Sequence, residues 1–301
     1  MKHLLGMKEC SATEIQEILT EAFRMKREVL EGSKKDNCLS GKSIITLFFE
    51  NSTRTRLSFE LASKYLGATA ANIAASGSSV AKGETLIDTA KNIDAMAADV
   101  VIIRHSSSGA PHLVSNYTNA SIVNAGDGMN EHPTQALLDF MTMQELKGEI
   151  RGLRVAIVGD VKHSRVARSN VYGLKKLGAD VVLAGPTTLM PCEIEQLGVK
   201  AYNDVEKAIA GADVVMGLRI QLERQKKGLF PTVRQYHKYF GINEERMRLA
   251  APDAILMHPG PVNRGVELSA DIIDGTQSVI GEQVTNGVCV RMAVLKLLTN
   301  K

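Results

Sequence analysis

Five consecutive residues whose side chains all donate hydrogen bonds, Ser52-Thr53-Arg54-Thr55-Arg56, are the chemically most informative stretch of the chain. They follow the apolar run 44–49 and precede a helical pattern of apolar residues at Leu57, Leu61 and Tyr65. Where a strand leads into a helix, the first backbone N–H groups have no partner within the helix, and the helix dipole favours an anion there. Guanidinium groups also bind phosphate in a bidentate way. The stretch therefore predicts a phosphate or carboxy-phosphate site.

A capped helix with solvated arginines is the alternative interpretation of the same stretch. Ser52 is a candidate N-cap residue, because serine is among the residues preferred at that position. A capped helix would account well for one arginine, but it accounts poorly for five consecutive donor-bearing residues.

Short apolar runs alternate with helical patterns along the chain, which is typical of an α/β protein. The runs are continuous, so we expect strands that are buried on both faces of parallel sheets. The predicted strands are 43–49, 100–103, 121–123, 153–158, 181–183, 214–216 and 254–257.

A domain boundary is predicted near 148–152, between the end of a helix that begins at Pro133 and a new strand. The last helical pattern, about 284–298, could pack back on the first domain. We therefore expect two domains, each a parallel β-sheet flanked by helices, joined by two interdomain helices. The predicted domains are 1–148 with the C-terminal helix 285–301, and 149–284.

The other candidate functional residues also lie where predicted strands end. Open α/β sheets bind ligands at the carboxyl ends of their strands, so six loops with cationic or donor side chains are expected to converge on one ligand site. Besides 52–56, these are Arg104-His105, 124–128 with 132–135, Gly159-Asp160 with Arg165 and Arg168, Arg219 with Gln221, and 258–261.

Each of these groups also has an ordinary interpretation when it is taken alone. Arg104 would be a surface residue, Pro133 is common at a helix start, and His132 would be structural. The small, polar stretch 78–85 carries Lys82 and could close over an anionic ligand, whereas its alternative interpretation is a solvated linker.

Composition excludes several classes of protein. A net charge of +3, no tryptophan and no block of Lys or Arg argue against nucleic acid as a partner. No apolar run approaches the roughly 20 residues that span a membrane, and the segment 1–6 lacks a secretory core, so a cytoplasmic protein is expected. No G-x-G-x-x-G or C-x-x-C pattern occurs, so we expect no nucleotide cofactor and no metal.

The same motifs resemble those of the transcarbamoylase family, in their order and over nearly the whole chain. The resemblance is closest to the aspartate-specific branch. It rests on Ser52-Thr53-Arg54-Thr55-Arg56-Leu57-Ser58-Phe59-Glu60, Lys82-Gly83-Glu84-Thr85, Arg104-His105, His132-Pro133-Thr134-Gln135, Arg219-Ile220-Gln221 with Glu223-Arg224, and His258-Pro259-Gly260-Pro261.

The resemblance implies a homotrimer of two-domain chains with active sites shared at subunit interfaces. The first domain would bind carbamoyl phosphate and the second L-aspartate. The reaction would give N-carbamoyl-L-aspartate and phosphate, an early step of de novo pyrimidine biosynthesis. Some members of the family assemble with a regulatory chain or a dihydroorotase, so either is a candidate partner.

Site residues carry over from the family by position in this sequence. Ser52, Thr53, Arg54 and Thr55 would hold the phosphate group, and Arg104, His132 and Gln135 would contact the carbamoyl group. Lys82 would reach the site from the neighbouring subunit, with Ser78 or Ser79 beside it. Arg165, Arg219 and Gln221, with Lys82, would bind aspartate, while Gly260 and Pro261 would supply backbone contacts. Glu50 would pair with Arg165 and Arg224 between the domains.

The chemistry of the residues agrees with this assignment. The α-amine of aspartate must attack the carbamoyl carbon, so the carbonyl oxygen gains charge and Arg104, His132 and Thr55 would serve as donors to it. Arg54 and Lys82 would stabilise the departing phosphate.

Two other functions are alternatives to this one. Ornithine transcarbamoylases share the phosphate half, but the family leads us to expect Ser-Met-Gly and His-Cys-Leu-Pro motifs there in place of 218–221 and 258–261. A pair of arginines suits a dicarboxylate and repels ornithine. A non-catalytic sensor of a phosphorylated metabolite would not need Lys82, His132 and Gln135 together.

Overall fold

The computed structural model describes residues 1–32, 34, 36–74, 83–192, 194–220 and 232–299. The chain divides into two compact units, the first formed by Met1–Met141 with Thr285–Lys301 and the second by Thr142–Val284. Helices α5 (Pro133–Lys147) and α11 (Ile280–Thr299) each run through a unit boundary, so two helices connect the units. The predicted domain bounds, with the first boundary at 148, stay a prediction.

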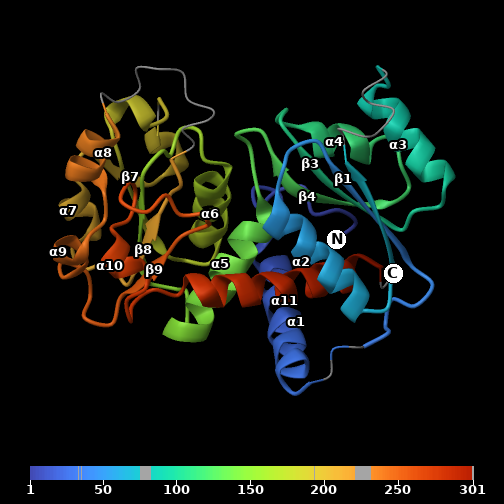
Figure 1. Cartoon of the computed structure of the whole chain (residues 1–301), viewed down its shortest axis with the longest axis horizontal. Helices are drawn as coiled ribbons and strands as arrows, with labels where there is room; N and C mark the ends of the chain where they lie inside the picture. Colours follow the sequence, from blue (N-terminus) through green and yellow to red (C-terminus); the bar gives the residue numbers. More distant parts are fainter. Residues whose placement is uncertain (33, 35, 75–82, 193, 221–231, 300–301) are drawn as a thin grey trace. The chain divides into compact units, whose positions relative to one another are not determined.

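The first unit is built on a parallel sheet with the strand order β2-β1-β3-β4. Helices α3 and α4 pack on one face of this sheet, where a core cluster joins Ala90, Ile93, Ala110 and Val114 to the strands (Figure 1). Its other elements are α1 (Ala12–Leu30), β1 (Ser43–Phe48), α2 (Thr53–Tyr65), β2 (Thr69–Ala74), α3 (Leu86–Ala95), β3 (Val100–His105), α4 (Ala110–Ser115) and β4 (Ser121–Asp127).

The second unit contains a parallel sheet with the order β7-β6-β5-β8-β9. Helices α7, α9 and α10 share a core cluster with one face of the sheet, and α6 is drawn on the other side (Figure 1). The elements are β5 (Arg154–Val158), α6 (Arg165–Lys176), β6 (Asp180–Ala184), η3 (Thr187–Leu189), η4 (Ile194–Leu197), β7 (Lys200–Tyr202), α7 (Val205–Ile209), β8 (Val214–Gly217), α8 (Val233–Phe240), α9 (Glu244–Met247), β9 (Ile255–Met257) and α10 (Ala270–Ile273).

The predicted fold class, two α/β domains with parallel sheets, is confirmed, and every predicted strand is present. The strands β2 and β7 were not predicted, and each lies at one edge of its sheet. Their sequences, Thr-Ala-Ala-Asn-Ile-Ala in β2 and Lys-Ala-Tyr in β7, are not continuous runs of bulky apolar residues. The last helix begins at Ile280, about four residues before its predicted start.

Parallel pairing brings the carboxyl ends of neighbouring strands to one edge of each sheet. In the first unit Phe48 of β1 stands opposite Arg104 of β3. In the second unit Val158 of β5 stands opposite Gly217 of β8. Within each unit, the polar segments that follow these strands therefore start at the same end of the sheet, where the carboxyl ends of the strands lie.

No helix within the described residues is both long and apolar enough to cross a membrane.

Glu131, which directly precedes His132, anchors the N-terminal segment of the first unit. Its buried carboxylate accepts hydrogen bonds from the backbone N–H groups of Met7 at 2.6 Å and Lys8 at 3.1 Å. We expect Glu131→Ala to lower the apparent melting temperature by about 5–10 °C, because two backbone donors lose their charged acceptor. Circular dichroism during heating measures this shift.

Glu9→Ala is the matched control for this variant. Glu9 is exposed and contacts the His112 ring nitrogen Nε2 at the surface, so its loss should change the melting temperature by no more than about 2 °C. Equal effects of the two variants would contradict the anchoring role of Glu131.

Candidate functional site

The N-terminus of α2 presents the predicted phosphate-binding residues. Ser52 stands at the N-cap position, as predicted, but its hydroxyl makes no capping hydrogen bond. Thr53 and Arg54 are exposed in the first turn, Thr55 is buried, and the turn contains no acidic residue. An exposed helix N-terminus that carries only hydroxyl and cationic side chains is suited to an anion.

Arg104, at the end of β3, is held against the neighbouring strand ends. Its Nη1 donates to the backbone oxygen of Ala125 at 3.1 Å, and its Nε lies 3.5 Å from Glu50 Oε2. Both side chains are 12% exposed, so the charge of Arg104 lies close to the surface. The two contacts fix its position. Glu50 thus contacts an arginine of its own unit, and its predicted interdomain role stays a prediction.

His105 follows Arg104 but does not add a competing charge. Partial burial lowers the pKa of His105, although the charges of Glu50 and Asp127 oppose this effect. Its Nδ1 accepts a hydrogen bond from the backbone N–H of Ser107 at 2.9 Å. A neutral His105 leaves Arg104 as the cation at this strand end.

His132 and Gln135 lie at the start of α5, the helix that follows β4, and β4 pairs with β3. His132 is buried, and its backbone oxygen accepts from the N–H group of Gln135 at 3.0 Å. The Gln135 side chain donates through Nε2 to Asp139 Oδ1 at 3.0 Å, and Asp139 is fully buried. Asp139 therefore orients the amide of Gln135. Asp139 was not predicted as a site residue, although its position one helical turn after Gln135 was a usable signal.

Lys82, Ser78 and Ser79 lie outside the described residues. Their predicted roles stay predictions.

Arg165, in the second unit, is the first residue of α6 and is 5% exposed. The turn before it is held by Asp160, whose carboxylate accepts from the backbone N–H of His163 at 3.1 Å and lies 2.9 Å from the His163 ring nitrogen Nδ1. Ser164 then caps α6 by accepting from the N–H of Ala167. Asp160 and Ser164 together fix the backbone that carries Arg165.

Gly159 brings the turn after β5 close to the segment after β8. Its φ is +137°, and a Cβ atom there would lie 3.0 Å from the Leu218 Cβ. A larger residue would strain the backbone and push these segments apart. Arg219, which follows Leu218, is half-buried at this strand end.

The segment 258–263 is tied to the same strand end. Asn263 donates through Nδ2 to the backbone oxygen of Ile220 at 3.0 Å. Glu267 accepts from the backbone N–H of Asn263 at 2.7 Å and lies 3.3 Å from His258 Nε2. His258 Nδ1 accepts from the N–H of Gly260 at 2.8 Å. The structure therefore brings Arg219 near the loop of Gly260 and Pro261, whereas Gln221 and Arg224 lie outside the described residues.

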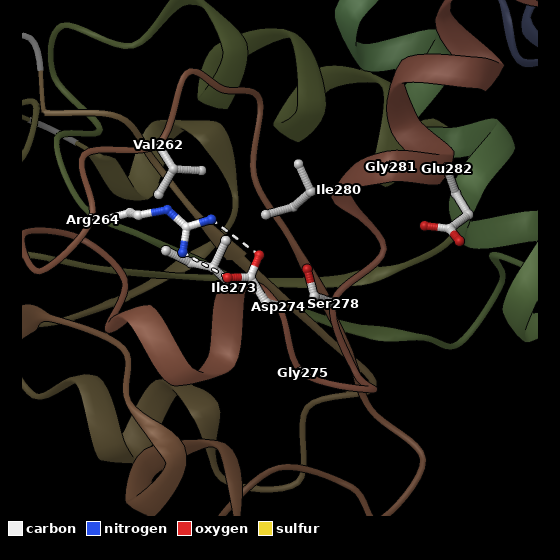
Figure 2. A pocket seen from close by; sticks show the side chains of 9 residues that line it. All are labelled: Val262, Arg264, Ile273, Asp274, Gly275, Ser278, Ile280, Gly281 and Glu282. Carbon is white, nitrogen blue, oxygen red and sulfur yellow. Dashed lines mark hydrogen bonds and ion pairs between the residues drawn. The ribbon is translucent and has the colours of Figure 1, made fainter.

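A pocket of about 540 Å³ in the second unit does not coincide with these residues. Figure 2 shows the side chain of Arg264 directed at Asp274, and the guanidinium and carboxylate pair at 2.7 and 3.0 Å. Glu282 adds a further negative charge to the lining. Arg264 is already paired with Asp274, and the lining carries two carboxylates in all. A dicarboxylate ligand would therefore be repelled from this pocket.

Two family models match the chain on either side of the predicted boundary. The carbamoyl-phosphate-binding domain of aspartate/ornithine carbamoyltransferases matches residues 2–145, and the Asp/Orn-binding domain matches residues 151–298. The chain belongs to the aspartate/ornithine carbamoyltransferase family. Within this family, the first model covers α2, Arg104 and His132, and the second covers Arg165 and Arg219.

Individual carbamoyltransferases are similar to the chain over its whole length. The aspartate carbamoyltransferase catalytic subunit of Ruminiclostridium cellulolyticum is 64% identical over 300 residues, which cover 100% of this chain and 96% of that protein. The ornithine carbamoyltransferase from Pyrococcus furiosus superposes with a TM-score of 0.89 at 32% identity, covering 99% of this chain and 97% of that one. Aspartate transcarbamoylase from Trypanosoma cruzi in complex with N-(phosphonacetyl)-L-aspartic acid gives a TM-score of 0.87 at 31% identity, with 98% and 95% covered.

Proposed function

We propose that the chain transfers the carbamoyl group from carbamoyl phosphate to the α-amine of L-aspartate, giving N-carbamoyl-L-aspartate and phosphate. The observation that carries the proposal is the exposed N-terminus of α2. Ser52 precedes the first turn, Thr53 and Arg54 belong to it, and this turn contains no acidic residue. Close relatives named aspartate carbamoyltransferase catalytic subunit support aspartate as the acceptor.

The first unit supplies the groups that bind and activate carbamoyl phosphate. Ser52, Thr53 and Arg54 bind the phosphate group through side-chain donors and through the N–H groups of the helix start. Arg104 and His132 stabilise the carbonyl oxygen as the amine attacks and negative charge develops on it. Because Arg104 is already fixed by Ala125 and Glu50, little reorganisation is needed during the reaction.

The second unit supplies the groups that bind the amino acid. Arg165 presents a guanidinium that is almost completely buried, where a bidentate pair with a carboxylate is stronger than in water. Arg219 provides a second cation for the other carboxylate of aspartate. Gly260 and Pro261 remain proposed backbone contacts to the carbamoyl group.

The proton balance of the reaction requires an acceptor for the proton that the amine loses. The C–N bond forms as the C–O bond to phosphate breaks, and phosphate leaves with a greater negative charge. We assign the proton of the attacking amine to this departing phosphate, so no covalent intermediate with the protein is needed.

A comparison of acceptors tests the proposed function. Phosphate release is measured with carbamoyl phosphate and either L-aspartate or L-ornithine under identical conditions. We expect release with L-aspartate and none above background with L-ornithine. Turnover of ornithine would overturn the assignment of Arg165 and Arg219, while no turnover with either amine would favour a sensor of phosphorylated metabolites.

The assembly is also part of the proposal. We propose a homotrimer in which Lys82 of one chain completes the site of its neighbour. A regulatory chain or a dihydroorotase as a further partner, and a cytoplasmic location, stay predictions.

A further inference from the structure

Asp139 is a fully buried carboxylate that lies one helical turn after Gln135 on α5. Its side chain is 0% exposed, and its Oδ1 accepts a hydrogen bond from Gln135 Nε2 at 3.0 Å. The backbone N–H of Gln135 donates to the oxygen of His132 at 3.0 Å, so the main chain and the side chain of Gln135 are both held. The amide of Gln135 is therefore fixed at one end by a group that has no access to solvent.

This hydrogen bond also determines which atom of the amide is left for a ligand. A carboxylate accepts hydrogen bonds and donates none, so the corner of the amide that faces Asp139 is the NH2 group. The other corner of the planar amide is the carbonyl oxygen Oε1. Gln135 is half-buried, and its Oε1 accepts no hydrogen bond from the residues that the structure describes. Gln135 thus offers an acceptor, and not a donor, to a bound molecule.

The segment that leads into α5 is tied to the carboxyl end of β4. The backbone N–H of Asp127 donates to the oxygen of Glu131 at 3.2 Å, and the N–H of Glu131 donates to Asp127 Oδ1 at 3.1 Å. Arg104 reaches the same strand end, because its Nη1 donates to the backbone oxygen of Ala125. Arg104 and the segment before α5 therefore both contact the end of β4.

We propose that Asp139 is a positioning residue that makes the site select a carbamoyl group over an acyl group of the same shape. This inference rests on the proposed function, in which Gln135 contacts the carbamoyl group. The NH2 group of carbamoyl phosphate can donate to Gln135 Oε1, whereas the methyl group of an acetyl phosphate cannot. An acyl phosphate leaves this half-buried acceptor unpaired, so it binds more weakly.

The carboxylate of Asp139 is needed for this selection because an amide has two different ends. Without an acceptor-only partner, the side chain of Gln135 could turn and present its own NH2 group to the ligand. Two NH2 groups that face each other form no hydrogen bond, since both are donors. The buried Asp139 prevents that orientation.

Two stable phosphonates that differ in one group test the selection. Phosphonoacetamide carries an NH2 group, and 2-oxopropylphosphonate carries a methyl group in its place. Calorimetric titration gives the dissociation constants of both and of inorganic phosphate. For the wild type, we expect the amide to bind about tenfold more tightly than the ketone, because one net hydrogen bond is worth about that factor.

Asp139→Asn replaces the carboxylate with an amide of the same size, which can either accept or donate. We expect the ratio of the dissociation constants of ketone and amide to fall to about two or less, because Gln135 is no longer held in one orientation. The affinity for inorganic phosphate should stay within about twofold of the wild type, since phosphate carries neither group. A purely structural role would weaken all three ligands together and leave the ratio unchanged, which would overturn the inference.

A double-mutant cycle shows whether Asp139 acts through Gln135. Gln135→Met removes the acceptor and should lower the ratio to about one. Adding Asp139→Asn to Gln135→Met should then change the ratio no further. A change as large as the one that Asp139→Asn causes in the wild type would overturn the inference, because Asp139 would act by another route. If Asp139→Asn fails to fold, Asp139→Ser, whose hydroxyl also accepts or donates, is judged by the same criteria.

Glu145→Gln is the matched control, because it makes the same change from carboxylate to amide at an exposed residue of α5. It should leave the ratio unchanged. A fall of the ratio equal to that in Asp139→Asn would contradict a specific role of Asp139.

The proposed function and this inference fail in different ways. Wild-type protein that binds none of the three ligands overturns the proposed phosphate site and the inference with it. Wild-type protein that binds inorganic phosphate but does not distinguish the two phosphonates overturns the inference alone, and so does an Asp139→Asn variant with the wild-type ratio.

Discussion

We expect Arg54→Ala to lower kcat by about 10²–10³-fold and to weaken the binding of inorganic phosphate. Arg54 lies exposed in the first turn of α2, where its charge adds to that of the helix N-terminus. The phosphate group gains negative charge as it leaves, so a guanidinium that contacts it contributes more in the transition state than in the ground state. Steady-state kinetics with carbamoyl phosphate and L-aspartate measure the loss.

Arg56→Ala is the matched control for Arg54. Arg56 is also exposed and lies only two residues further along the same helix, but it is not among the proposed ligand-binding residues. We expect its kcat to stay within about twofold of the wild type, because a solvated arginine is well screened. Similar losses in both variants would show a general effect of charge rather than a specific role of Arg54.

The Arg54 variant also tests the proposed shared site. Lys82→Ala and Arg54→Ala, each nearly inactive by itself, are unfolded, mixed and refolded together. A site that takes Arg54 from one chain and Lys82 from its neighbour would be intact in part of the mixed trimers. We expect activity to return on mixing, and its absence from trimers shown to be mixed would count against sharing.

Arg165→Ala is expected to produce the second large effect, a loss in the use of aspartate without a loss in phosphate binding. The catalytic efficiency kcat/KM for L-aspartate should drop at least about 100-fold, because the carboxylate loses a charge-assisted pair at a site where Arg165 is 5% exposed. Phosphate binding should stay within about twofold of the wild type, since Arg165 belongs to the second unit. Kinetics at varied aspartate and calorimetric titration with phosphate separate the two quantities.

Two further variants make this result specific. Arg168→Ala changes an arginine one turn further along α6 and should leave the KM for aspartate nearly unchanged. Arg165→Met keeps the buried volume, so it separates the loss of charge from the loss of packing. A phosphate-binding defect in Arg165→Met as large as its aspartate defect would refute the assignment of Arg165 to the amino acid.

The sequence was sufficient for the features that depend on local pattern. The continuous apolar runs predicted each central strand, because a strand covered on both faces needs apolar side chains at every position. The start of α1 also depends on residues close in the sequence: Ser11 caps the helix by accepting from the N–H of Glu14, and Glu14 accepts from the N–H of Ser11. The strands β2 and β7 escaped prediction, because neither contains a continuous run of bulky apolar residues.

The tertiary structure alone decided what surrounds the predicted residues. The contact of Glu50 with Arg104 exists because two strands pair in a particular register, which no motif in either segment states. Arg291 stands far from Phe59 in the chain, and only the packing of α11 against α2 brings its guanidinium to 5.1 Å from the centre of that ring. Motifs identify the side chains that can bind a ligand, because their chemistry is local. The electrostatics and fixed positions of those side chains depend on long-range packing, which appears only once the chain has folded.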